Sequence, residues 1–220
     1  MNHIKLKTVV AVCVAAFVSA SAQAVMLEVN VWEATPGKGA AMFEIGRKAK
    51  AIQEKHGARV VIGNEFTGKM IYSIRSDNWQ TCNSTAGKFL ADPAWQALVR
   101  DADSRGIMKN TGNFLINLIA PAPRTGNVFQ TFVWEAIPGR TADLFAAAMN
   151  AQKIHTAAGA YVSVGADQKN RLMYMMSFDG WEHFAKFQDR PNSDAESFMD
   201  EVYLDPPGRL VEVYTSGSVE

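Results

Sequence analysis

Cysteine is scarce in this sequence. Its 220 residues include two, Cys13 and Cys82, and Cys13 lies in an N-terminal segment that we expect to be removed. One remaining thiol excludes an intrachain disulfide, and the absence of a cysteine cluster excludes a thiolate zinc site. Cys82 is then either a buried, inert side chain or an exposed, reactive thiol.

An excess of charge of either sign is also absent. The chain has 22 Lys and Arg and 22 Asp and Glu. Loss of Lys5 and Lys7 with the N-terminal segment leaves a net charge of −2. A near-neutral protein gives no electrostatic basis for binding nucleic acid or an anionic membrane, so we expect neither as a partner.

Local catalytic motifs are missing as well. The sequence has no glycine-rich phosphate loop, no nucleophile elbow and no pair of histidines spaced for a metal. The histidines outside the N-terminal segment are His56, His155 and His183. We therefore predict no metal site and no cofactor. Haem ligation by His155 or His183 is an alternative, because an axial ligand needs only one histidine; a histidine at a helix end is the structural interpretation.

The N-terminal segment has the pattern of a signal peptide. Lys5 and Lys7 precede an apolar run, Val9–Val18, and Ala22-Gln23-Ala24 is an A-x-A cleavage site. The run is too short to span a bilayer. We predict that residues 1–24 are cleaved, that the mature chain begins at Val25 in the periplasm, and that it has no membrane attachment.

The most informative feature present is an internal repeat. Val31-Trp32-Glu33-Ala34-Thr35-Pro36-Gly37-Lys38 returns 102 positions later as Val133-Trp134-Glu135-Ala136-Ile137-Pro138-Gly139-Arg140. The match continues without a gap to Trp79 and Trp181. A repeat of this length is a duplicated domain. We predict a first repeat over 25–120, a linker over 121–127 and a second repeat over 128–220.

Each repeat has the pattern strand, helix, strand, strand, helix, strand. The predicted strands are 26–34, 59–62, 70–75 and 114–120 in the first repeat, and their counterparts in the second include 161–164, 172–177 and 210–215. Helical spacing covers 38–56, and Gly57 and Gly159 suit left-handed C-caps. Asp77 and Asp179 are the predicted N-caps of the second helices, which Pro93 and Pro191 interrupt before helix resumes over 94–104 and 193–203.

This order is the ferredoxin-like unit, whose sheet carries helices on one face only. The open apolar face must be covered, and a duplicated unit can cover it. The predicted fold class is therefore α+β: two tandem ferredoxin-like units that pair as an α+β barrel.

Several motifs carry a resemblance to a known group. The first strands are followed by Pro36-Gly37 and Pro138-Gly139, the long helix ends at His56-Gly57, and Asp92-Pro93-Ala94-Trp95 forms a D-P-x-W stretch. Together they resemble the dimeric α+β barrel superfamily, and most of all its NIPSNAP-like members. The second repeat has Arg190-Pro191-Asn192-Ser193 instead of D-P-x-W. The resemblance implies a small-molecule cavity. The superfamily it points to includes antibiotic-biosynthesis monooxygenases and haem proteins.

Repeated aromatic residues and a cluster of methionines are the candidate pocket residues. They are Trp32, Tyr72, Trp134, Tyr174, Met173 and Met175. Strand alternation places Trp32 and Glu33, and likewise Trp134 and Glu135, on opposite faces of their strands. Tyrosine can hydrogen-bond a ligand, and methionine can line an adaptable apolar pocket. Core packing is the alternative role for all six.

Three functions remain open on this basis. The first is a module that binds a small apolar ligand without turnover. The second is an enzyme, either a cofactor-independent monooxygenase or a haem-linked one. The third is a structural module that assembles into a homo-oligomer.

Overall fold

The computed structural model describes residues 25–190, 197–198, 200, 202 and 204–219. The predicted signal peptide and most of the helix predicted over 193–203 lie outside the described residues. The elements are β1 (Met26–Ala34), α1 (Gly39–Lys55), β2 (Arg59–Glu65), β3 (Met70–Ser76), α2 (Trp79–Leu90), α3 (Pro93–Arg105), β4 (Met108–Ala120), β5 (Val128–Ala136), α4 (Thr141–Ala157), β6 (Tyr161–Asp167), β7 (Leu172–Phe178), α5 (Trp181–Gln188) and β8 (Gly208–Ser218). Within the described part of the chain, no helix has both the length and the apolar character needed to cross a bilayer.

The chain divides into two compact units. The described residues of the first unit are 25–113 with Val219, and the second unit is Phe114–Ser218. The division falls inside β4, which contributes to both. The predicted repeat bounds remain predictions, because a duplicated segment and a compact unit need not end at the same residue.

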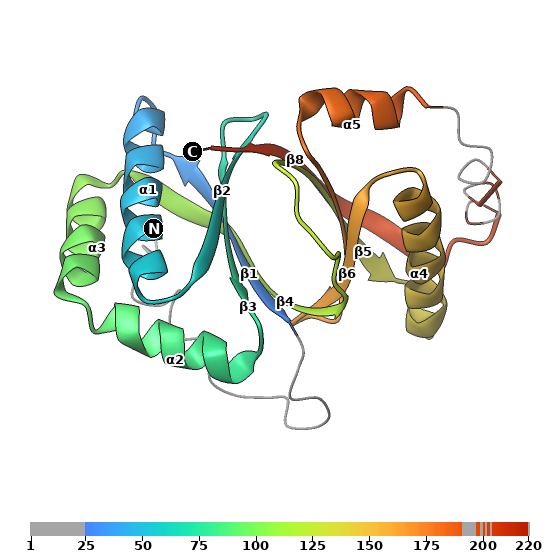
Figure 1. Cartoon of the computed structure of the whole chain (residues 1–220), viewed down its shortest axis with the longest axis horizontal. Coiled ribbons are helices and arrows are strands. Elements are labelled where there is room, and N and C mark those ends of the chain that lie inside the picture. The colour runs from blue at the N-terminus through green and yellow to red at the C-terminus, as the bar shows by residue number, and fades with distance from the viewer. Residues whose placement is uncertain (1–24, 191–196, 199, 201, 203, 220) are drawn as a thin grey trace. The chain divides into compact units, whose positions relative to one another are not determined.

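The first unit is an antiparallel sheet with helices on one face. Its strands follow the order β1-β3-β2, with Asn30 opposite Tyr72 and Tyr72 opposite Ile62. Helices α1, α2 and α3 lie on one side of this sheet (Figure 1). The face of α1 that turns inward carries Met42, Ile45 and Ala49, which recur at helical spacing and are buried.

The second unit repeats the arrangement. Its order is β8-β5-β7-β6, and the last residues of β4 pair with β6. Helices α4 and α5 lie on one side of its sheet (Figure 1). Leu144, Ala148 and Ala151 of α4 are buried at the positions of Met42, Gly46 and Ala49. The predicted α+β class is confirmed.

Glycines terminate the same elements in both units. Gly57 (φ +91°) follows the C-cap of α1, and Gly159 (φ +107°) follows that of α4. Gly37 and Gly139 have φ values of +79° and +83° in the turns after β1 and β5. Residues other than glycine rarely adopt such positive φ values, so the predicted left-handed glycines at these helix ends are confirmed.

The predicted N-caps of the second helices are wrong. Asn78, whose Oδ1 accepts from the Thr81 backbone N–H at 2.8 Å, caps α2, and Gly180 precedes α5. Asp77 instead forms two hydrogen bonds with the Arg59 guanidinium, and Asp179 pairs with Arg124. In both units the N-cap lies one residue later than predicted, and the aspartate pairs with an arginine.

Candidate functional site

The first unit contains a cavity of ≈ 100 Å³ between its sheet and its helices. The floor is the helix-facing side of β1 and β3. Helices α1, α2 and α3 form the walls, mostly with apolar side chains. The principal apolar lining residues are Trp32, Ile45, Ala49, Met70, Ile74, Phe89, Trp95, Leu98, Val99 and Met108.

Strand alternation selects the residues on the floor. Successive side chains of a strand point to opposite faces, so Glu28, Asn30 and Trp32 of β1 share the helix-facing side. Tyr72 and Ser76 of β3 lie on the same side and also line the cavity. The predicted pocket residues Trp32 and Tyr72 thus lie together, with polar neighbours that the sequence interpretation did not select.

Glu28 is the carboxylate in this cavity. Its Oε1 accepts a hydrogen bond from Asn30 Nδ2 at 3.0 Å. Burial raises the pKa of Glu28, and the Asn30 hydrogen bond opposes this effect only in part. A carboxyl group with a raised pKa in an apolar cavity is a candidate for proton transfer. Counting back from Trp32 in steps of two would have found both Glu28 and Asn30.

Tyr72 is the second polar group on the floor. Its hydroxyl donates to Gln53 Oε1 at 2.6 Å, and both side chains are buried. Burial raises the pKa of Tyr72 well above its ordinary value, with the charges of Glu54 and Glu28 adding to the shift. The phenol is therefore neutral at physiological pH, and it acts as a hydrogen-bond donor rather than a base.

The D-P-x-W stretch positions one wall of the cavity. Asp92 caps α3 by accepting from the Ala94 backbone N–H at 2.8 Å, and Pro93 occupies the first turn. Trp95 then packs edge-on against Phe89, with ring centroids 5.0 Å apart. His56 Nε2 lies 2.8 Å from Asp92 Oδ2. This hydrogen bond, with that from Ala94, lowers the pKa of Asp92 to about 2.

The second unit keeps the tyrosine and fills the surrounding space. Tyr174 forms a 2.7 Å hydrogen bond with Nδ1 of His155, which stands at the position of Gln53. Phe132 and Phe178 stand at the positions of Asn30 and Ser76. Phe178 is completely buried, and its ring lies 5.1 Å from that of Phe187. Aromatic side chains thus occupy the second unit where the first has polar or small ones.

The remaining predicted pocket residues lie elsewhere in the second unit. Trp134 and Tyr174 pack in or against its hydrophobic core. Met173 and Met175 flank Tyr174 on β7 and so point to the opposite face of the sheet. The structure therefore does not bring these six residues into one place: two line the first cavity, two belong to the second core, and two lie on the other face.

The glutamates beside the repeated tryptophans lie in surface ion pairs. Glu33 lies 3.3 Å from Lys109, and Glu135 lies 2.6 Å from Arg209. Their equivalent placement in the two units fits a structural role. Cys82 is buried and lines the first cavity, which agrees with the buried alternative.

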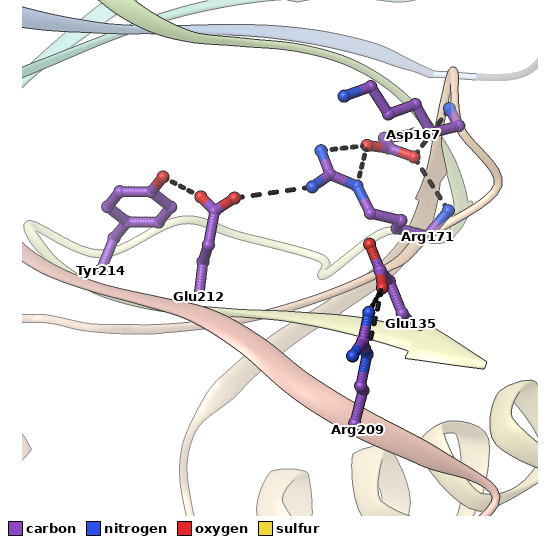
Figure 2. A network of polar contacts seen from close by, with 7 residues as sticks. Glu135, Asp167, Arg171, Arg209, Glu212 and Tyr214 are labelled. Atoms are coloured by element: carbon purple, nitrogen blue, oxygen red, sulfur yellow. Dashed lines mark hydrogen bonds and ion pairs between the residues drawn. The ribbon is translucent and has the colours of Figure 1, made fainter. Parts of the chain in front are cut away.

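A second polar cluster joins the end of β6 and the turn before β7 to β8 in the second unit (Figure 2). The Asp167 side chain has no exposed surface and lies 2.7 Å from Nη2 of Arg171. Arg171 reaches Glu212 at 3.5 Å, and Tyr214 donates to the same carboxylate. Asp167 also accepts from the backbone N–H groups of Lys169 and Arg171 at 2.9 and 2.8 Å. Asp167 and Arg171 hold the turn between β6 and β7, and Glu212 and Tyr214 lie on β8, so the cluster links this turn to β8 within the second unit.

The two predicted haem-ligand candidates are engaged by protein groups. His155 Nδ1 is bound to Tyr174, and its ring packs 5.8 Å from that of Phe187. His183 Nδ1 accepts from the Asp179 backbone N–H at 3.2 Å, and its ring lies 5.4 Å from that of Phe178. None of the described residues that line the cavity of the first unit is a histidine. As packed, these residues do not fit a haem. Among the described residues no group of three His, Cys, Asp or Glu side chains is placed to hold a metal ion.

No protein-family model matches this sequence, and no curated protein matches it. Solved structures do match. A proposed monooxygenase from Fusobacterium nucleatum is 11% identical, with a TM-score of 0.60 over 90% of this chain and 94% of its own. A chlorite dismutase variant from Candidatus Nitrospira defluvii is 7% identical, with a TM-score of 0.54 over 91% of this chain and 93% of its own. A haem-binding protein from Thermus thermophilus is 9% identical, with a TM-score of 0.54 over 90% and 92%. At these identities the likeness shows the fold alone, the α+β barrel class that the sequence predicts.

Proposed function

We propose that the first unit binds a small hydroxylated aromatic molecule and that Glu28 removes a proton from it, in a cofactor-independent oxygenation. One observation carries this proposal: a partly buried carboxyl group, with a raised pKa, lies inside an otherwise mostly apolar cavity. A general base is most effective when its pKa lies near the working pH, and burial moves a glutamate in that direction.

The chemistry requires a base and an apolar enclosure. Removal of a proton from a phenol, or from its CH₂ keto tautomer, leaves an electron-rich anion that can reduce O₂ directly. The overall reaction converts the CH₂ group and O₂ into C=O and H₂O. Glu28 accepts the proton, Asn30 holds the carboxylate, and Trp32 and Trp95 supply flat apolar surfaces for the ring.

The size of the cavity limits the ligand. An apolar cavity of about 150 Å³ takes up benzene. The cavity of the first unit, ≈ 100 Å³, is of the same order. One substituted ring, or a small fused pair, is the expected substrate, and a haem is far too large.

The comparisons support this proposal over simple binding. Among the matched solved structures are proposed monooxygenases from Fusobacterium nucleatum and Lactobacillus acidophilus, which share the fold. Binding without turnover is the second candidate, and the apolar lining favours it. We also propose that the chain is NIPSNAP-like, because two of the three motifs of that resemblance, His56-Gly57 and D-P-x-W, meet through the His56–Asp92 hydrogen bond.

The test measures binding and oxygen uptake with phenol, 1-naphthol and the larger anthrone. We expect saturable quenching of tryptophan fluorescence by 1-naphthol, and oxygen uptake that yields 1,4-naphthoquinone and water. Glu28→Gln should lower the rate at least about 100-fold and keep binding. Glu33→Gln, on the opposite face of the same strand, is the matched control and should keep both.

Two results would count against the proposal. Uptake by Glu28→Gln at the wild-type rate would remove Glu28 from the reaction. Binding of 1-naphthol without oxygen uptake for any of the three compounds would leave binding without turnover as the function.

We further propose that the protein is exported to the periplasm and forms a homo-oligomer. The first described strand begins at Met26, directly after the proposed mature start at Val25. Native mass spectrometry of the exported protein would show a chain that starts at Val25 and the mass of its assembly. A chain that retains residues 1–24 would contradict export with cleavage.

A further inference from the structure

Asn30 connects Glu28 to a residue outside the cavity lining. The Nδ2 of Asn30 donates to Glu28 Oε1 at 3.0 Å. Its Oδ1 accepts from Asn113 Nδ2 at 2.8 Å and, more weakly, from Asn110 Nδ2 at 3.4 Å. Asn30 is buried, with 5% of its surface exposed. Both ends of this buried amide are therefore in use.

The orientation of the Asn30 amide determines what Glu28 can do. An amide N–H₂ facing the carboxylate stabilises its ionised form, whereas an amide oxygen there would require a protonated carboxyl group as donor. Turning the Asn30 amide over would place two N–H₂ groups against each other at Asn113. The donor from Asn113 thus disfavours the reversed orientation.

We infer that Asn113 is a positioning residue for Glu28: by donating to Asn30, it fixes the end of the amide that faces the carboxylate. The inference rests on the proposed function for its catalytic meaning, because a base must be ionised before the substrate binds. Asn113 lies on β4 and does not line the cavity. It reaches the Glu28 carboxylate through Asn30.

Other groups around Glu28 do not replace this donor. Within the described chain, Asn30 is the residue whose side chain hydrogen-bonds the Glu28 carboxylate. The other titratable groups of the cavity lining are Tyr72 on β3 and Cys82 on α2. Tyr72 is committed to Gln53 at 2.6 Å. None of the lining residues contributed by α1 and α3 is titratable.

The test is a direct titration of the Glu28 carboxyl carbon by NMR. The full mature chain is labelled with ¹³C at the glutamate side-chain carboxyl, and Glu28→Gln assigns the signal. Asn113→Leu should raise the midpoint by about one pH unit, a tenfold change in proton affinity, because the charge-stabilising hydrogen bond is no longer enforced. Asn113→Ala should give the same direction without added bulk. Asn64→Leu, at an exposed position of β2, is the control and should leave the midpoint unchanged.

The titration separates this inference from the proposed function. An unchanged midpoint in both Asn113 variants overturns the inference, even if the wild type takes up oxygen. A raised midpoint supports it, even if the wild type catalyses no oxygenation. Where uptake occurs, the pH at half-maximal rate should move upward with the midpoint.

Discussion

The two units share a scaffold but differ in the space beside one tyrosine. Tyr72 and Tyr174 occupy equivalent positions, and each hydroxyl bonds a side chain of the long helix at 2.6 or 2.7 Å. Around Tyr72 the structure has a cavity with Glu28 and Asn30. Around Tyr174 it has packed aromatic rings, Phe132 among them at 6.5 Å. The tyrosine contact belongs to the fold, and the cavity belongs to one unit.

The positions where the repeat fails therefore identify the site. Glu28, Asn30 and Ser76 correspond to Gln130, Phe132 and Phe178. Each change removes a charge or replaces a small polar group with a bulky ring. Residues that both units retain, such as Trp32 with Trp134, do not distinguish a site from a core.

We expect the largest effect from a substitution that destabilises the β6–β7 hairpin of the second unit. The equivalent substitution in the β2–β3 hairpin of the first unit should have little effect. The Asp167 side chain is wholly buried and pairs with Arg171, whose side chain is 12% exposed, whereas the equivalent Glu65 and Lys69 are both partly exposed. Asp167→Asn leaves the guanidinium without its closest counter-ion. Loss of one partner of a buried pair costs about 3 kcal/mol or more. Urea unfolding should show this loss of stability for the second unit.

Glu65→Gln is the matched control for that hairpin. A partly exposed carboxylate contributes less than about 1 kcal/mol, so the unfolding midpoint should hardly move. Equal destabilisation by Asp167→Asn and Glu65→Gln would show that the two hairpins are held in the same way.

The next largest effect should come from giving the cavity of the first unit a residue of the second. Ser76→Phe introduces the ring that Phe178 supplies in the second unit and places it at the cavity. We expect binding of 1-naphthol to weaken more than about tenfold, because the ring occupies the ligand's space. Ser76→Ala, which adds no bulk, should bind as the wild type does. Fluorescence titration measures both, and unchanged binding by Ser76→Phe would place the ligand elsewhere.

The fold could be predicted largely from the sequence because its signals are local. The bounds of β1, Met26–Ala34, were predicted correctly from apolar residues that end at a Pro-Gly turn. β2 was predicted too short, over 59–62, since pairing with β3 extends it to Glu65 through Gly63 and Asn64. These residues have weak strand propensity alone, and the neighbouring strand overrides it.

The site was predicted only in part, for a physical reason. Trp32 and Tyr72 are large, repeated aromatics, so the pattern revealed them. Glu28 and Asn30 do not stand out in the sequence, because the second repeat has Gln130 and Phe132 in their places. Their roles also depend on burial and on Asn113, which lies more than 80 positions after Asn30 in the chain. No local spacing encodes such a contact.

The smallest effect concerns the helix residue that bonds each tyrosine. Burial lowers the pKa of His155, whereas Gln53 does not titrate. The surroundings of His155 are Tyr174 on β7 and the Phe187 ring on α5, neither of which supplies a negative charge. As pH falls below the ordinary histidine value of about 6.5, the unfolded chain gains a proton that the folded chain resists. Folding is therefore destabilised progressively, until pH falls below the lowered pKa of the native state.

His155→Gln gives the second unit the residue of the first and should remove this acid sensitivity. Between pH 7.5 and pH 5 we expect the wild type to lose more free energy of unfolding than the variant does, by less than about 1 kcal/mol. Urea unfolding at both pH values measures it, and Gln53→His should introduce a similar sensitivity into the first unit. Equal acid sensitivity of His155→Gln and the wild type would show that His155 titrates alike in the folded and unfolded chains. The two helix positions would then differ in size and shape alone.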